Sequence, residues 1–197
     1  MTTDMTIDMT KACRRTADVV AGVSDEQLGA PTPCEGLPVD ELVAHLGGLA
    51  SAFAAAGRKE FGPLTDTPPE FGAKPEAGWR TEYPRRLMDL ADAFADPPAW
   101  TGMSRAGGVD FPGEVAGVVA LTEVVVHGWD LARATGQPYE VNADTAAAVL
   151  PHVEQIAAED PVDGLFAAAR PVADDAPVLD RLVALTGRDP AWGARIA

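Results

Sequence analysis

Cysteine is scarce in this sequence of 197 residues, which contains only Cys13 and Cys34. Two cysteines cannot form the disulfide framework of a small secreted domain, and a cytosolic setting argues against pairing them. Cys13 lies on an apolar helical stripe, which favours a role as a small core residue. Cys34 lies in a proline-rich turn, and no basic residue stands beside it in the sequence to lower the pKa of its thiol.

Positive charge is also scarce, because 15 Lys and Arg residues face 30 Asp and Glu residues and the net charge is −15. This balance repels phosphate backbones and anionic lipid surfaces, so nucleic acid is excluded as an expected partner. We interpret the acidic residues mainly as a solvated surface.

Long apolar runs are absent as well, since none reaches the roughly 18 residues of a membrane helix. The first eleven residues do not combine a basic start with an apolar stretch, which a signal peptide requires. We therefore expect a cytoplasmic protein with no membrane partner, and its length suits one domain, or one domain with a short appendage.

The pattern of apolar residues is helical almost throughout and predicts an all-α fold. Proline and glycine mark two long loops at 62–78 and 96–111, and only 166–172 has the composition of a short edge strand. Pro84 is expected in the first turn of its helix. The predicted helices are about 4–21, one that begins at Pro38, about 81–95, about 112–135, about 142–158 and 178–186.

The predicted helix before Gly136 is nearly all apolar, which is typical of the buried centre of a bundle. Glu123 and His127 interrupt it, and their spacing places both side chains on one face, a single turn apart. A buried carboxylate normally becomes protonated or binds a cation. A Glu and a His that face inward together are therefore a candidate pair of metal ligands.

His45 is the third candidate ligand, because Leu42, Leu46 and Leu49 surround it on the apolar face of its own helix. The glycines that follow it, Gly47 and Gly48, allow close backbone approach or leave room for a ligand. Two histidines and one carboxylate are typical of a catalytic metal site with an open position.

Each candidate ligand has a simpler interpretation. His127 alone fits a core histidine that is hydrogen-bonded to a carbonyl, and Glu123 and His127 fit a salt bridge without metal. The same Glu-x-x-x-His spacing occurs at Glu41 and His45, where Glu41 fits a first-turn residue that complements the helix dipole.

A longer pattern gives these residues a context. Residues 121–136 read Leu-Thr-Glu-Val-Val-Val-His-Gly-Trp-Asp-Leu-Ala-Arg-Ala-Thr-Gly, and the chain also has Ala30-Pro-Thr-Pro-Cys34 and Leu42-Val-Ala-His45-Leu. Towards its end it has Asp175-Ala-Pro, Leu182-Val-Ala-Leu and Gly187-Arg-Asp-Pro190. Together these segments resemble the DinB-like superfamily, and more closely its branch named for mycothiol-dependent maleylpyruvate isomerase.

The resemblance implies an up-down-down-up four-helix bundle at residues 1–137, with a short, mostly helical extension at 138–197 packed on it. It implies a divalent metal, commonly zinc and sometimes nickel, held by His45, Glu123 and His127, and the same ligands also suit iron. It also implies mycothiol or a similar low-molecular-weight thiol as a partner.

Two departures limit what the resemblance implies. Leu37 stands where the family usually has Trp, which concerns local packing alone. The isomerase has a sizeable C-terminal α/β domain that helps to bind the thiol, whereas this chain has about sixty residues after Gly136. The expected function is thus a metal-dependent thiol S-transferase or isomerase with an uncharacterised small-molecule substrate.

The alternatives are a non-catalytic metal- or thiol-binding bundle, a metal-dependent hydrolase, and a metal-free polar network that serves a dimer interface. In the enzyme hypothesis Asp130 is the candidate catalytic residue, which orients a ligand or takes a proton. Its simpler interpretation is a surface residue that pairs with Arg133 or Arg105. His152 lacks a carboxylate at ligand spacing and is left out of the site.

Overall fold

The structure is a computed structural model that describes residues 6–68, 70, 72–159 and 166–193. Over these residues the chain is mostly helical and has one small two-stranded sheet, so the predicted helical class is confirmed. In chain order the elements are α1 (Thr10–Ala21), η1 (Asp25–Gln27), α2 (Val39–Arg58), α3 (Pro63–Asp66), α4 (Trp79–Ala95), η2 (Pro97–Trp100), β1 (Met103–Ala106), β2 (Val109–Pro112), α5 (Gly113–Thr135), α6 (Ala143–Ala157) and α7 (Val178–Leu185).

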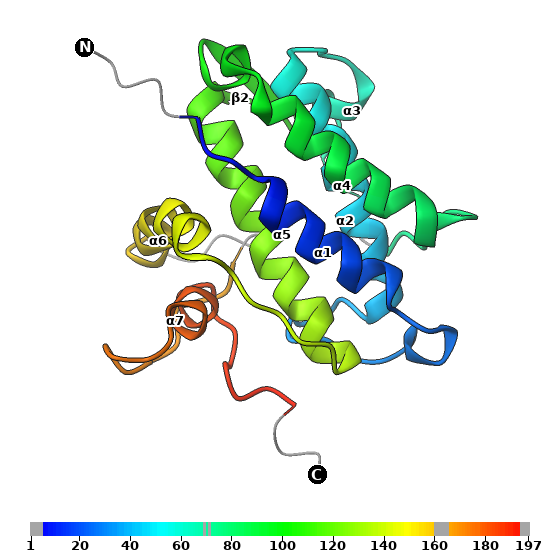
Figure 1. Ribbon diagram of the computed structural model, residues 1–197, viewed down its shortest axis with the longest axis vertical. Helices are drawn as coiled ribbons and strands as arrows, with labels where there is room; N and C mark the ends of the chain where they lie inside the picture. The colour runs from blue at the N-terminus through cyan, green and yellow to red at the C-terminus, as the bar shows by residue number, and fades with distance from the viewer. Residues whose placement is uncertain (1–5, 69, 71, 160–165, 194–197) are drawn as a thin grey trace.

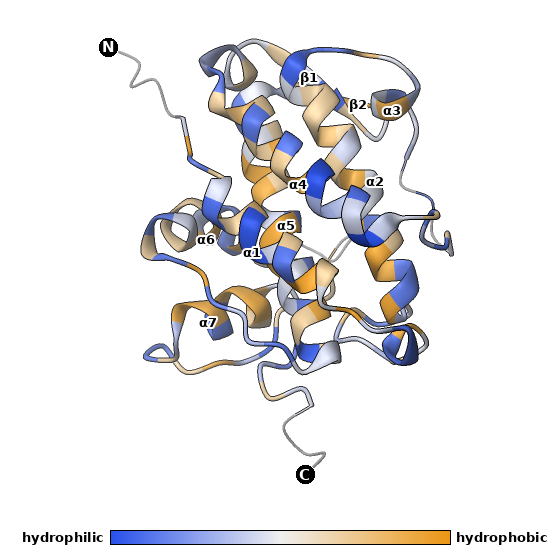
Figure 2. Cartoon of the chain, turned by 45° about the vertical axis from the view of Figure 1, so that its right-hand side comes forward, coloured by the Kyte–Doolittle hydropathy of each residue, from blue (hydrophilic) through white to orange (hydrophobic). Residues whose placement is uncertain are grey.

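Helices α1, α2, α4 and α5 make the most extensive contacts between helices. Helices α1 and α2 each pack against both α4 and α5. Helix α6 contacts α5, and α7 contacts α6, so these two lie together on one side of α5 (Figure 1). Around α1 and α4 hydrophobic positions alternate with hydrophilic ones, as expected for helices with one buried face (Figure 2).

Helix α5 is the most buried of the long helices and begins and ends where the sequence predicts. Pro112 precedes its first residue, and Gly136 follows its last with a φ of 69°, the left-handed conformation that commonly ends a helix.

By length and composition, both α2 and α5 could cross a membrane, which corrects the expectation that no segment is long enough. However, 56% and 78% of their apolar windows are buried inside the protein, so they are core helices.

The segment 96–111 is more ordered than the predicted loop. It contains η2 and most of an antiparallel hairpin in which Met103 pairs with Pro112 and Ala106 with Val109. The buried Ser104 hydroxyl donates a hydrogen bond of 2.8 Å to the carbonyl of Ala56, which fixes the hairpin to α2. Strands of four residues are too short for alternation to reveal them in the sequence.

Three local predictions were wrong. Helix α1 begins at Thr10 rather than at residue 4, and residues 4 and 5 lie outside the described part. Pro84 lies inside α4, six residues into the helix, rather than in its first turn. Residues 166–172 form no strand, because the backbone N–H of Arg170 instead binds the carbonyl of Ala184 at the end of α7.

Helix α2 approaches α4 closely at Gly47. A Cβ atom at this position would lie 2.6–2.7 Å from atoms of the Tyr83 ring, so the aromatic side chain occupies the space that a side chain at 47 would need. Gly48 is exposed and has no neighbouring atom within 4 Å of the same position. Gly47 therefore serves the contact between helices, whereas Gly48 has no packing role.

This difference predicts opposite effects for two neighbouring substitutions. Gly47→Ala should destabilise the protein by about 1–3 kcal/mol, because the new methyl group overlaps the buried Tyr83 ring. Gly48→Ala should stabilise it by about 0.5–1 kcal/mol, because alanine loses less conformational entropy in a helix. Urea unfolding of both variants checks this, and equal effects of the two would contradict the packing assigned to Gly47.

Candidate metal centre

The structure brings the three predicted ligands together. His45 comes from α2, and Glu123 and His127 come from α5. Oε2 of Glu123 lies 3.7 Å from Nε2 of His45 and 3.1 Å from Nε2 of His127. One donor atom from each residue lies within 4.8 Å of the other two, so all three donors converge on one point.

The helices impose this arrangement. Glu123 and His127 are one turn apart on α5, and α2 packs alongside, so His45 enters from the neighbouring helix. The two imidazole rings meet edge to face, with centroids 5.0 Å apart and planes at 88°. The side chains of His45, Glu123 and His127 are 12%, 19% and 6% exposed, so the cluster is sheltered but reachable on the side of His45 and Glu123.

The electrostatics of the cluster are those of a tight ion pair in the metal-free protein. Burial raises the pKa of Glu123, but hydrogen bonds from His127 and His45 outweigh it and hold the pKa well below its usual value. Burial lowers the pKa of His127, but hydrogen bonds to Asp130, Cys34 and Glu123 outweigh it and hold the pKa well above its usual value. The cluster therefore concentrates negative charge around His127.

Asp130 is not at the surface, and it pairs with neither Arg133 nor Arg105. Its carboxylate is fully buried and accepts a hydrogen bond of 3.0 Å from Nδ1 of His127. It also accepts two hydrogen bonds from Arg188. Arg105 pairs with Asp110 and Asp66, and Arg133 donates to the carbonyl of Pro190, which corrects the surface interpretation.

Cys34 belongs to a second cluster that sequence reasoning missed. Its sulfur, a donor atom of His127 and one of Asp130 lie within 4.8 Å of one another. Thr32 holds the turn by donating to the carbonyl of Leu37 (2.7 Å) and accepting from the N–H of Cys34 (3.1 Å). The basic neighbour that the sequence seemed to lack is His127, which is distant in the chain. The position of Cys34 within the resembling motif was the only signal that could have found it.

Two further residues define the surroundings of the cluster. His152 on α6 is in neither group of donor atoms among the described residues, although the charge of Glu123 acts on it and opposes the lowering of its pKa by burial.

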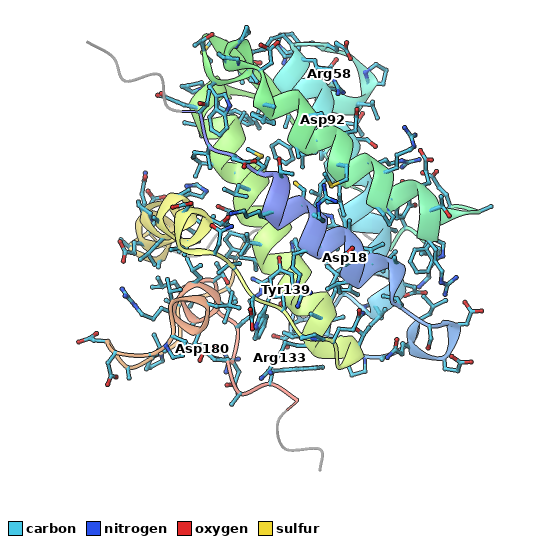
Figure 3. The ribbon with its side chains drawn as sticks, viewed as in Figure 1. Asp18, Arg58, Asp92, Arg133, Tyr139 and Asp180 are labelled. Carbon is cyan, nitrogen blue, oxygen red and sulfur yellow. The ribbon has the colours of Figure 1, made fainter. Side chains whose placement is uncertain are left out.

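Gly128, next to His127, has no space for a side chain because the hydroxyls of Thr16 and Tyr139 lie against it. Tyr139 follows α5 in the chain and lies over that helix beside α1 (Figure 3).

Comparison with known proteins identifies the family to which the chain belongs. The family model for the mycothiol maleylpyruvate isomerase N-terminal domain matches residues 9–132, which include all three candidate ligands. The chain belongs to this DinB-like family.

The relatives found among curated proteins carry no assigned activity. They are the uncharacterized proteins MT0763 and Rv0738 from two strains of Mycobacterium tuberculosis. Each is 29% identical to this chain over 180 residues, which cover 87% of this chain and 91% of the relative. No solved structure matches the chain significantly.

The environments of the two cysteines predict different reactivity. Burial raises the pKa of the Cys13 thiol to about 12, so at pH 8 roughly one molecule in ten thousand carries the reactive thiolate. Cys34 is only half-buried. Iodoacetamide at pH 8 should therefore modify Cys34 in the folded protein and Cys13 only after unfolding, as peptide mass spectrometry can show. A Cys34→Ser variant should stay unmodified until denatured, and labelling of Cys13 in that folded variant would contradict the assignment.

Proposed function

We propose that His45, Glu123 and His127 bind one divalent metal ion. The observation that carries this proposal is the convergence of two imidazole nitrogens and one carboxylate oxygen from two helices within 4.8 Å. In a tetrahedral site with bonds of 2.0–2.1 Å, neighbouring donors are about 3.3 Å apart. The distances of 3.1 and 3.7 Å at Glu123 bracket this value, so the residues present fit a metal.

The donor set favours a catalytic site over a structural one. Three protein ligands leave a fourth position, and the partial exposure of His45 and Glu123 gives that position access to solvent. Zinc is the first choice of metal, and nickel or iron suits the same ligands.

The family supports a reaction that involves a low-molecular-weight thiol. We propose a metal-dependent thiol S-transferase or isomerase that uses mycothiol or a similar thiol and a small-molecule substrate. A bound divalent ion would act as a Lewis acid and lower the pKa of a thiol or water at the open position. The part of Asp130 is to orient His127, because its buried carboxylate is already engaged by His127 and Arg188.

The same proposal includes the architecture that the resemblance implies. Helices α1, α2, α4 and α5 would form the up-down-down-up bundle, since each of the first two packs against both of the others. Residues 138–197 would form an extension on this bundle, and the protein would act in the cytoplasm. Light scattering of the purified protein would show whether it forms a homodimer.

A metal-free network is the competing interpretation, and the close contacts of Glu123 with both histidines favour it. Metal analysis separates the two. Protein produced without a histidine tag should contain close to one equivalent of metal, and His127→Ala and His45→Ala should each lose it. His152→Ala is the matched control and should keep it, because His152 is outside the donor cluster. Equal trace amounts in wild type and His127→Ala would mean that the site binds no metal.

The reaction needs a separate test. Metal-loaded protein should consume a low-molecular-weight thiol in the presence of some member of a panel of electrophiles, or isomerise a conjugated diacid. Removal of the metal by a chelator should abolish turnover, and adding it back should restore turnover. Metal binding without turnover of any thiol or hydrolysable substrate would instead support a binding protein.

A further inference from the structure

Behind the candidate ligands lies a second layer of buried charge, in which the proposed function gives a role to Asp130 but none to Arg188. Arg188 is 6% exposed and Asp130 is fully buried. Nη2 of Arg188 donates to Oδ2 of Asp130 at 2.9 Å, and Nε donates to Oδ1 at 3.2 Å. The guanidinium group thus engages both oxygens of a carboxylate that also accepts from Nδ1 of His127.

The two partners of this ion pair come from different parts of the chain. Asp130 is on α5, within the matched family domain, whereas Arg188 follows α7 and lies beyond residue 132, where the family match ends. Gly187 adopts a φ of 83°, and the carbonyl of this glycine accepts a hydrogen bond of 2.6 Å from Nε of Arg170. The C-terminal segment is therefore folded so that it turns Arg188 towards α5.

Other contacts hold the guanidinium group in place. Nη1 donates to the carbonyl of Thr186 at 2.8 Å, and the group lies over the ring of Phe166, 5.2 Å from its centroid. Arginine engaged through a planar fork fixes the orientation of a carboxylate better than a single point charge does. A carboxylate fixed in this way presents one oxygen to Nδ1 of His127, which leaves Nε2 directed at Glu123.

We propose that Arg188 is a positioning residue of the metal site, which acts through Asp130 to fix the imidazole of His127. The C-terminal extension would thereby supply a residue that sets metal affinity, although it holds none of the three ligands. This inference rests on the proposed metal site. Partners that orient ligating histidines typically affect metal affinity by about 10–100-fold.

Arg188→Met tests the proposal, because methionine keeps much of the apolar volume and removes the fork. Its Zn²⁺ affinity, measured by competition with a chromogenic chelator, should fall about 10–100-fold. The Zn²⁺ affinity of Arg188→Lys should lie between those of wild type and Arg188→Met, since lysine keeps the charge but cannot make the second hydrogen bond to Asp130. Asp130→Asn should weaken binding in the same direction, and the visible spectrum of bound Co²⁺ should change in all three variants.

Arg133→Met is the matched control. Arg133 also connects α5 to the C-terminal segment, through a hydrogen bond of 2.7 Å to the carbonyl of Pro190, whereas the hydrogen bonds of the Asp130 carboxylate within the described residues go to His127 and Arg188. Its replacement should leave Zn²⁺ affinity and the Co²⁺ spectrum unchanged. Urea unfolding of each metal-free variant separates loss of the fold from loss of the site, and Arg188→Lys decides the matter if Arg188→Met does not fold.

Failure of this inference differs from failure of the metal site itself. If wild type binds Zn²⁺ and the Arg188 variants bind it equally well with the same Co²⁺ spectrum, Arg188 does not position the ligand. If wild type binds no metal, the proposed function fails, and NMR of the metal-free protein still tests the contact. The hydrogen-bonded Nδ1 proton of His127 should then be visible in wild type and exchange rapidly in Arg188→Met, and identical signals would overturn the proposal.

Discussion

The carboxylate of Glu123 lies on a helix whose surroundings are almost entirely apolar, and it is mostly withdrawn from water. An isolated charge in such a place is expensive, so the fold must supply positive groups next to it. His127, whose pKa is raised well above its usual value, supplies one from the following turn of α5, and the imidazole of His45 on α2 lies 3.7 Å from the same carboxylate. The burial of Glu123 therefore requires that α2 pack on α5, because that packing brings His45 to the carboxylate. A metal ion would meet the same requirement, which is why the geometry suits both an ion pair and a metal centre.

Small residues allow the helices to approach closely enough to bring His45 and His127 to Glu123. Gly47 accommodates the Tyr83 ring between α2 and α4, and Gly128 accommodates the hydroxyls of Thr16 and Tyr139 between α1 and α5. Each glycine stands within two residues of a candidate ligand in the sequence. The backbone next to His45 and His127 is thus packed tightly against neighbouring elements, so the two imidazoles are held by rigid parts of the fold. Rigid placement of ligands is what a selective metal site requires.

Local signals explain why much of the fold could be predicted from the sequence. Pro112 and Gly136 mark the ends of α5 through their own backbone preferences, and the spacing of Glu123 and His127 follows directly from helical periodicity. His45 needed the resemblance, because nothing local says which face of another helix it will meet. The β hairpin was missed because its strands are short, and its attachment through Ser104 to α2 depends on tertiary contact. The cluster that contains Cys34 was missed for the same reason, since His127 and Asp130 come from a distant helix.

The sequence predicts a boundary at residue 137 between a metal-binding domain and a C-terminal extension. Buried charges on the two sides of this boundary contact each other. The ion pair of Asp130 and Arg188 crosses that boundary, and both partners are almost completely buried. Separating the two parts would leave Arg188 without its carboxylate and Asp130 with His127 alone, at a cost larger than that of a surface salt bridge. Arg188 of the C-terminal segment thus helps to neutralise a carboxylate that lies directly behind His127. In a chain whose family match ends at residue 132, the ion pair of Asp130 and Arg188 thus joins the C-terminal segment to the carboxylate that contacts His127.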